Sequence, residues 1–248
     1  MKIISHRGKI DISKKSENNL KAINNFMDSN IEMIEIDIQL TKDKNIILYH
    51  DDNIKIKNNY CCGLFNYYKT NNILDLDKDF LMEQELIYLK DALDLIKGER
   101  EIYLDIKNEN LQDNEYKLFF EILLKLLDEY ILKYKCERST IYLASFYEKY
   151  ASFISNIPVE YKKGIILNKE NLDFLKNNYS VKNFPFDFIS IDYDLLDNEI
   201  IKNYFNKAII FCWTVNDNNS FSNIINNYNI NGIVTDYPVK FLNLTKFL

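Results

Sequence analysis

Two carboxylate residues, Glu35 and Asp37, alternate with isoleucines in the segment EMIEIDIQL. This alternation predicts a β-strand, because successive side chains of a strand point to opposite faces. The isoleucines would then share one face, and Glu35, Asp37 and Gln39 would share the other. Two interpretations follow: a strand with one face in water, or a pair of carboxylates held side by side to bind a cation. The alternation alone favours neither.

Histidine occurs twice in the chain, as His6 and His50, and each lies at the end of a predicted strand. Each also stands next to a charged residue, Arg7 in one case and Asp51 in the other. A single histidine is more often a surface residue or a core residue whose hydrogen bonds are satisfied. Two histidines at the ends of predicted strands favour acid–base chemistry instead, because the unperturbed pKa of histidine suits proton transfer near neutral pH.

Polar residues also end other apolar runs of the chain. Asp105 and Lys107 alternate with apolar residues in IYLDIK, Ser190 and Asp192 do so in FISIDY, and Trp213 follows a further run. For Asp105 and Lys107 alone, a solvated strand face is an equally good interpretation. Polar groups at the ends of so many separate strands favour a shared site.

Short β-branched runs alternate with helical patterns along the 248 residues. Strands are predicted at Lys2–His6, Met33–Leu40, Ile46–His50, Glu101–Lys107, Thr140–Phe146, Lys163–Leu167, Phe188–Tyr193, Ala208–Val215 and Gly232–Asp236. Helices are predicted at Glu17–Asp28, Leu89–Ile96, Glu115–Lys133, Glu148–Ser155, Glu170–Asn177, Asp197–Phe205 and Ser220–Tyr228, with Ser16 and Asp197 as N-caps of the first and sixth. This order predicts parallel β/α units closed into a TIM (β/α)8 barrel, an α/β fold whose active sites lie at the carboxyl ends of the strands.

Two stretches depart from the β/α alternation. Only residues 41–45 separate the second and third predicted strands, which is too short for a parallel crossover, so we expect a hairpin and one strand outside the barrel. Residues 51–87 are polar and tyrosine-rich, and we expect a variable excursion over the barrel mouth there. Its aromatic residues are more typical of core than of a pocket wall. Because no linker rich in Pro, Gly or Ser occurs, we expect a single domain over residues 1–248.

Composition excludes several other classes of protein. The net charge of −6 and the pI near 5.1 argue against a nucleic-acid partner, which would require a basic surface. No apolar run is long enough for an integral membrane segment, and the run in MKIISHRG is too short for a signal peptide, so we expect a cytoplasmic protein. The four cysteines lack disulfide or zinc spacing and are predicted to be free thiols. The oligomeric state is left open.

The motifs HRG, SEN, E-x-D-x-Q-x-T-x-D, HD, YLDIK, WTVND and TDYP occur in this order along the chain. Their combination resembles the glycerophosphodiester phosphodiesterase family, a branch of the phosphatidylinositol-phospholipase-C-like barrels. The resemblance covers nearly the whole chain and is weakest at residues 52–87 and 108–185. It implies a (β/α)8 barrel that hydrolyses a small-molecule glycerophosphodiester to glycerol phosphate and an alcohol.

The resemblance also implies roles for individual residues. By position, Glu35, Asp37 and Asp105 match metal ligands, His6 and His50 match a general acid/base pair, Arg7, Lys107 and Glu17 match phosphate or substrate contacts, and Trp213 lines the substrate pocket. The implied cofactor is one divalent metal ion, Mg²⁺ or Ca²⁺, which the hard carboxylate oxygens suit. The implied nucleophile is the neighbouring glycerol hydroxyl, which gives a cyclic phosphate that water then opens. Which histidine is the acid is not determined.

Three departures from the family pattern concern the site. Ser16 replaces the usual proline before Glu17, Asp105 is one methylene shorter than the commoner glutamate, and the usual run after HDD is absent. The substrate therefore has alternatives: a lysophospholipid or a polysaccharide that contains glycerol phosphate. A catalytically silent barrel that only binds phosphorylated ligands is the alternative from another class. Because no expected histidine or metal ligand is missing, the enzyme is favoured.

Overall fold

The computed structural model describes residues 1–11, 16–41, 44–51, 53–55, 67–69, 86–107 and 111–246. In these residues the parallel strands are β1 (Lys2–Ser5), β2 (Met33–Leu40), β6 (Glu101–Ile106), β7 (Ile141–Ala144), β8 (Lys162–Leu167), β9 (Phe188–Asp192), β10 (Ile209–Trp213) and β11 (Gly232–Thr235). Each pairs with its neighbour in chain order, and β1 pairs with both β2 and β11, which closes the ring. The predicted (β/α)8 barrel is confirmed.

The predicted hairpin is also confirmed. Strand β3 (Ile46–Leu48) runs antiparallel to β2, with Ile38 opposite Leu48, and does not belong to the parallel ring. Strands β4 (Asn53–Lys55) and β5 (Tyr67–Lys69) pair with each other. The predicted excursion over the mouth otherwise lies outside the described residues, as do Cys61 and Cys62, and the single-domain organisation stays a prediction. Cys136 and Cys212 are free thiols, as expected.

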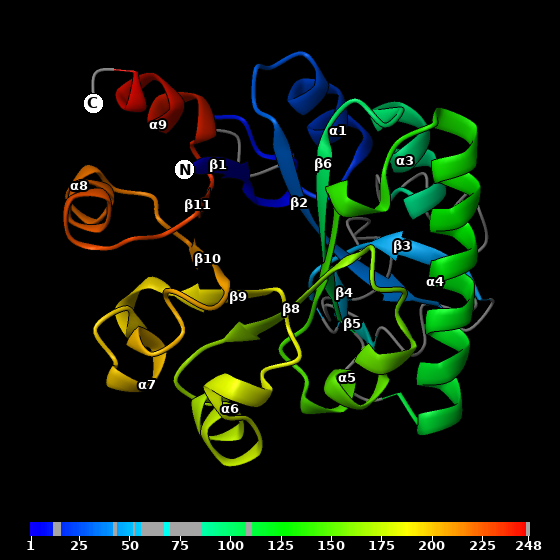
Figure 1. Cartoon of the computed structure of the whole chain (residues 1–248). Coiled ribbons are helices and arrows are strands. Elements are labelled where there is room, and N and C mark those ends of the chain that lie inside the picture. Colours follow the sequence, from blue (N-terminus) through cyan, green and yellow to red (C-terminus); the bar gives the residue numbers. More distant parts are fainter. Residues whose placement is uncertain are drawn as a thin grey trace.

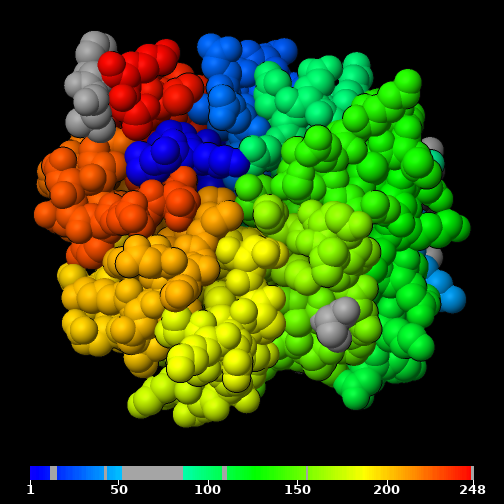
Figure 2. Space-filling model, viewed as in Figure 1, coloured from blue at the N-terminus to red at the C-terminus, as the bar shows by residue number. Residues whose placement is uncertain are grey.

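Helices surround the barrel in the order of the sequence, as the colours of Figures 1 and 2 show. They are α1 (Leu20–Met27), α3 (Leu89–Ile96), α4 (Asp113–Tyr134), α5 (Glu148–Phe153), α6 (Leu172–Asn178), α7 (Glu199–Lys202), α8 (Asn218–Asn227) and α9 (Pro238–Thr245). Short 3₁₀ turns occur at η1 (His6–Gly8), η3 (Arg138–Thr140), η4 (Ile154–Asn156), η5 (Val181–Asn183) and η6 (Tyr193–Leu195). Helix α9 was not predicted. None of the helices in the described part of the chain has the length and apolar character needed to span a membrane.

The two predicted N-caps are wrong. Helix α1 is capped by Asn19, whose side chain accepts a hydrogen bond from the Ala22 N–H at 2.9 Å, and not by Ser16. Asn18 has the left-handed φ of 49°, so the helix cannot continue back to Glu17.

The sixth helix of the sequence prediction also begins later than expected. Helix α7 is capped by Asn198, whose side chain accepts from the Ile200 N–H at 2.9 Å. The Asp197 carboxylate instead accepts a hydrogen bond from the Tyr228 hydroxyl at 2.7 Å. In both helices the cap is therefore the residue directly before the first helical one, where a short side chain reaches the free N–H groups.

The strands divide the core into two parts. Outward-facing side chains such as Ile34, Ile36 and Ile38 pack against the helices in one large cluster. The inward-facing apolar side chains form a second cluster, here called the barrel plug: Ile4, Met33, Tyr103, Tyr142, Ala144, Ile166, Phe188, Phe211 and Val234. The plug fills the barrel toward its amino end. Toward the carboxyl ends the inward face becomes polar, and a cavity opens there.

Candidate active site

The cavity at the carboxyl ends of the strands has a volume of about 460 Å³, counted to its open mouth. Its lining residues are His6, Arg7, Glu35, Asp37, His50, Tyr103, Asp105, Lys107, Phe146, Ile166, Ser190, Trp213, Thr214 and Val234. Every predicted site residue except Glu17 is among them. Glu17 lies behind Arg7, where its Oε1 accepts a hydrogen bond from a guanidinium nitrogen at 3.2 Å.

Three carboxylates meet on the floor of this cavity. Asp37 of β2 lies opposite Asp105 of β6 in the strand register, and Glu35 is one inward position earlier on β2. Each residue offers one oxygen, and these oxygens lie within 4.8 Å of one another. All three side chains are buried, with residue exposures of 1 to 6%. The barrel thus gathers carboxylates that are 68 or 70 residues apart in the sequence.

Burial and mutual repulsion shape the charges of this trio. Burial, together with the neighbouring carboxylates, raises the pKa of Glu35 well above its ordinary value, and burial likewise raises the pKa of Asp105. Burial opposes ionisation of Asp37 too, but the charges of Lys107 and Arg7 outweigh it and hold the pKa of that carboxyl below its usual range. An ionised trio without a further cation is therefore costly.

The same trio fits a divalent cation. Asp105 Oδ1 is buried and has no hydrogen-bond partner among the described residues. Carboxylate oxygens are the hard ligands that Mg²⁺ and Ca²⁺ prefer, and three of them leave positions for water or a phosphate oxygen. A cation held by Glu35, Asp37 and Asp105 would offset their repulsion. The donor set, the orphaned oxygen and the raised pKa values all point to such a site.

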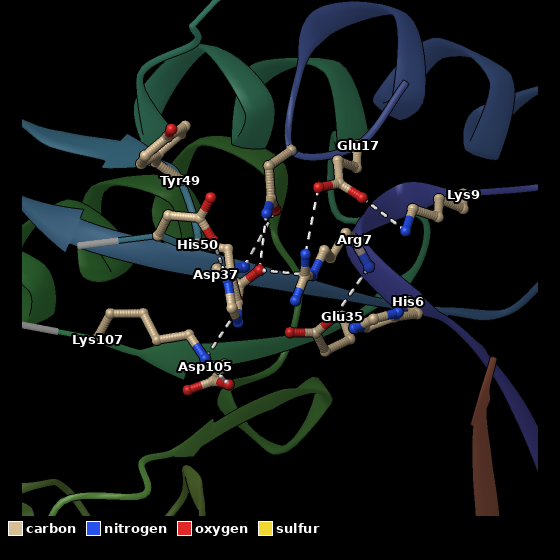
Figure 3. A network of polar contacts seen from close by, with 12 residues as sticks. His6, Arg7, Lys9, Glu17, Glu35, Asp37, Tyr49, His50, Asp105 and Lys107 are labelled. Carbon is tan, nitrogen blue, oxygen red and sulfur yellow. Dashed lines mark hydrogen bonds and ion pairs between the residues drawn. The ribbon is translucent and has the colours of Figure 1, made fainter. Parts of the chain in front are cut away.

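Two basic side chains border the trio (Figure 3). The Lys107 ammonium lies 2.7 Å from Asp105 Oδ2 and 3.1 Å from Asp37 Oδ1. Although burial works against its charge, the two carboxylates raise the pKa of Lys107, so it stays protonated. Arg7 Nε lies 3.2 Å from Asp37 Oδ2, an ion pair without hydrogen-bond geometry. Both cations could contact an anionic phosphate in the cavity.

A tight turn at η1 delivers Arg7 to the cavity. Arg7 and Gly8 both have left-handed backbone conformations, with φ of 55° and 74°. The turn also directs the Arg7 N–H to Glu35 Oε2, at 2.9 Å. A Cβ on residue 8 would lie 3.2 Å from the Cβ of Ala22, so glycine meets both the backbone and the space requirement here.

Each histidine pairs through its Nδ1 with an aspartate. His6 Nδ1 lies 2.7 Å from Asp236 Oδ1, and His50 Nδ1 lies 2.8 Å from Asp51 Oδ1. An ionised carboxylate only accepts hydrogen bonds, so Nδ1 carries the proton and the neutral ring keeps Nε2 free to take one. The side chain of His6 is 18% exposed, whereas that of His50 is 38% exposed at the rim. Burial lowers the pKa of His6 despite its aspartate partner.

An aromatic wall lines the other side of the cavity. The rings of Trp213 and Phe146 meet edge to face at a centroid distance of 5.4 Å. The Lys107 ammonium lies 5.1 Å from the centre of the Phe146 ring, a cation–π contact. Trp213 Nε1 is buried without a hydrogen-bond partner among the described residues. The wall therefore offers apolar contact and one free donor to a ligand.

Several residues support the site without having been assigned a role from the sequence. Asn18 donates to Asp37 Oδ2 at 2.7 Å and accepts from the Asp37 N–H at 3.1 Å, so it fixes that carboxylate. Asn216 donates to Asp236 Oδ2 at 2.8 Å. Lys9 contacts Asp236 as well. Asn18 and Asp236 belong to the motifs SEN and TDYP, which was the available signal. Asn216 belongs to the motif WTVND in the same way, whereas Lys9 carried no signal.

Fold and site together define a barrel hydrolase with a carboxylate trio, flanking cations and two histidines at one opening. The model of the glycerophosphoryl diester phosphodiesterase family matches residues 6–240. The chain belongs to this family and is a hydrolase of phosphoric diesters.

Known relatives are similar to this chain over nearly their whole length. The glycerophosphodiester phosphodiesterase of Caldanaerobacter subterraneus subsp. tengcongensis is 24% identical, over 98% of this chain and 97% of that protein. The crystal structure of a Thermotoga maritima glycerophosphodiester phosphodiesterase has a TM-score of 0.73 at 20% identity, covering 98% of each chain. An Oleispira antarctica phosphodiesterase in complex with its product sn-glycerol-3-phosphate has a TM-score of 0.74 at 16% identity, covering 99% and 97%. These structural likenesses concern the fold.

Proposed function

We propose that the protein hydrolyses a glycerophosphodiester to glycerol phosphate and an alcohol, with one divalent cation and two histidines. The observation that carries this proposal is the convergence of three carboxylates, two cations and two His–Asp pairs on one cavity. Membership of the family and the product named for the Oleispira structure support the choice of substrate. A barrel that only binds phosphorylated ligands, without catalysis, would not require two oriented histidines.

The substrate phosphate would lie between the trio and the two cations. Glu35, Asp37 and Asp105 would hold the metal, Mg²⁺ or Ca²⁺, which when bound supplies positive charge that stabilises the transition state. Arg7 and Lys107 would bind the non-bridging phosphate oxygens and oppose the charge that grows on them. Trp213 and Phe146 would contact the carbon skeleton of the substrate. Glu17 would act through Arg7, which it holds at 3.2 Å.

Proton transfer would be divided between the histidines. His6, whose pKa burial lowers, is neutral at pH 7 and suits the base that removes the proton from the neighbouring glycerol hydroxyl. That oxygen then bonds to phosphorus while the bond from phosphorus to the leaving oxygen breaks. His50 at the rim suits the acid that protonates this leaving alkoxide. Water would open the resulting cyclic phosphate with the two roles reversed.

A substrate panel tests this function. Purified protein should release glycerol phosphate from glycerophosphocholine or glycerophosphoethanolamine when Mg²⁺ or Ca²⁺ is present, measured with a coupled glycerol-phosphate assay. A lysophospholipid and a polymer of glycerol phosphate belong in the same panel, because faster turnover of either would favour the alternative substrates. No turnover of any of these phosphodiesters would contradict the proposal.

The metal requirement is tested in the same protein. A chelator should abolish turnover, and either Mg²⁺ or Ca²⁺ should restore it, which also ranks the two ions. In calorimetric titrations, Glu35→Gln should bind the metal more weakly than wild type, because one of three charged ligands is lost. Unchanged metal affinity in that variant would put the ion elsewhere. The cytoplasmic location stays a prediction, which cell fractionation would test.

A further inference from the structure

Lys9 follows the η1 turn and contacts Asp236, but it does not line the cavity. Its backbone is held on both sides: its N–H donates to the His6 carbonyl at 3.0 Å, and its carbonyl accepts from the Ser5 hydroxyl at 2.6 Å. Its side chain is only 14% exposed. A lysine this buried usually has charged partners, since its ammonium is costly to remove from water.

The Lys9 ammonium joins two carboxylates that each hold a residue of the site, and Figure 3 shows its contact with the first of them, Glu17. It lies 2.6 Å from Glu17 Oε2 and 3.1 Å from Asp236 Oδ1. The other oxygen of Glu17 accepts from Arg7 at 3.2 Å. Asp236 Oδ1 is the same oxygen that meets His6 Nδ1 at 2.7 Å. One ammonium therefore connects the partner of the histidine with the partner of the arginine.

The contacts of Asp236 leave it little freedom. Its Oδ2 accepts from Asn216 at 2.8 Å, and its backbone N–H donates to Asn216 Oδ1 at 2.9 Å. Lys9 supplies the remaining contact, on the oxygen that faces His6. Glu17 is less constrained, with a side chain 34% exposed, so Lys9 matters more for its placement.

Charge balance favours the same role for Lys9. The connected network holds five carboxylates, on Glu17, Glu35, Asp37, Asp105 and Asp236, and three cations, on Arg7, Lys9 and Lys107. Two formal negative charges remain, which one divalent cation would neutralise. Without Lys9 the network would stay negative even with that cation bound, and an anionic phosphodiester would be repelled.

We propose that Lys9 is a positioning residue for phosphodiester hydrolysis: its ammonium holds Asp236 against His6 and Glu17 against Arg7. This inference rests on the proposed function of the site. It assigns Lys9 two separable effects. Through Asp236 it supports proton transfer by His6 and therefore kcat, and through Glu17 it supports phosphate binding by Arg7 and therefore KM.

Lys9→Met tests the proposal, and a second lysine of the chain provides the control. We expect kcat to fall on the order of 10-fold and KM to rise, as for other residues that orient the groups of a site. Lys2→Met is the matched control. Lys2 lies at the amino end of β1, away from the site, and it is likewise part-buried and ion-paired, in this case with Glu101 of β6. It should leave both kinetic constants near the wild-type values. Lys9→Arg, which keeps the charge, should recover most of the lost turnover.

A double-mutant cycle identifies the path through Asp236. If Lys9 acts on kcat through Asp236, Lys9→Met should lower kcat little or not at all in an Asp236→Asn background, while its effect on KM should remain. Equal reductions of kcat with and without the Asp236 carboxylate would overturn the proposal. So would a Lys2→Met variant that loses as much turnover as Lys9→Met.

A spectroscopic readout separates this proposal from the proposed function. The chain has two histidines, so the imidazole ¹H–¹⁵N signals can be assigned with a His50→Asn variant. Lys9→Met should shift the His6 Nδ1–H signal in the absence of any substrate, and Lys2→Met should not. An unchanged His6 signal in Lys9→Met would overturn the role of Lys9, whatever the substrate. Failure of wild type to turn over the panel, with the shift present, would instead count against the proposed function alone.

Discussion

The two ends of the barrel interior are built from the same strands but hold opposite chemistry. Toward the amino end the plug is built of apolar and aromatic side chains, with the Lys2–Glu101 ion pair beside Tyr142, and Phe188, Phe211 and Tyr142 pack with ring centroids 5.4 to 5.6 Å apart. Toward the carboxyl end they are charged and paired. Strand β2 changes from Met33 to Glu35 along its inward face, and the plug ends there.

The difference shows how one strand can serve stability and chemistry at once. The plug excludes water from below, so the carboxylates above it are buried and their pKa values shift. Tyr103 belongs to both parts, since it packs in the plug and lines the cavity. A substitution in the plug should therefore change mainly stability, and one above it mainly turnover.

The largest expected effect is at the carboxyl end of the barrel, where the site lies. His6→Ala and His50→Ala should each lower kcat by a factor on the order of 10² to 10⁴, because each removes one of the two groups proposed to transfer protons. Urea unfolding should give a midpoint close to wild type for His50→Ala, whose ring lies at the rim, and a somewhat lower one for His6→Ala, which removes the hydrogen-bond partner of Asp236. Steady-state kinetics on the best substrate of the panel measures the first effect. Wild-type turnover in either variant would remove that histidine from the mechanism.

The next effect is in the plug. Phe188 is fully buried, and its ring fills the space beside Gly164, where an added Cβ would lie 2.3 Å from ring atoms. Phe188→Ala should lower the free energy of unfolding by about 3–5 kcal/mol, measured by urea denaturation.

Leu132 provides the control for this substitution. It is 79% exposed on α4, so Leu132→Ala should change the free energy of unfolding by no more than about 0.5 kcal/mol. If Phe188→Ala were as mild as Leu132→Ala, the plug would not be the stabilising part of the barrel interior.

The smallest effect concerns pH and Asp236. Burial opposes its ionisation, but the hydrogen bond with His6 and the nearby Lys9 charge lower the pKa of Asp236 below its usual range. Such a group stabilises the folded state above its unfolded pKa of about 3.9, and this contribution is lost as the pH falls through the folded pKa. Asp236→Asn should therefore lose stability at pH 7 and show a shallower further loss in acid.

Urea unfolding of both proteins at neutral pH and below about pH 4 measures this difference. Parallel loss of stability in wild type and Asp236→Asn would show that other groups cause the acid sensitivity.

Most of the fold could be predicted from local patterns in the sequence. Alternation along residues 33–40 predicted which face of β2 packs on helices, and Ile34, Ile36 and Ile38 do so. Helix ends were less accessible, because the left-handed Asn18 that delays α1 depends on its contacts with Asp37 and the Arg7 carbonyl. Helix α9 was not predicted, because the apolar residues of its sequence do not follow a clear helical period.

The sequence analysis named the charged residues that line the candidate site, and Trp213, but not Phe146 or the residues that support the site. His6, Glu35 and Asp105 carry signals in their type, spacing and motifs. Asn216 lies in the motif WTVND but was given no role. Lys9 carries no signal, because a lysine on a loop is common and its partner Asp236 is far away in the sequence. Asp236 lies 230 residues from His6 and meets it only because β1 pairs with β11.

The sequence by itself determined the order of strands and helices and the alternation of apolar and charged residues. Backbone geometry makes these properties local, since a strand repeats every two residues wherever it lies. Only the tertiary structure decided which charged groups become neighbours. Pairing of β2 with β6 sets Asp37 opposite Asp105, and pairing of β1 with β11 brings Asp236 beside His6 and Lys9. The barrel also buries the carboxylate trio over the plug. Those distances and that burial, which depend on the whole chain, turn scattered polar residues into one site.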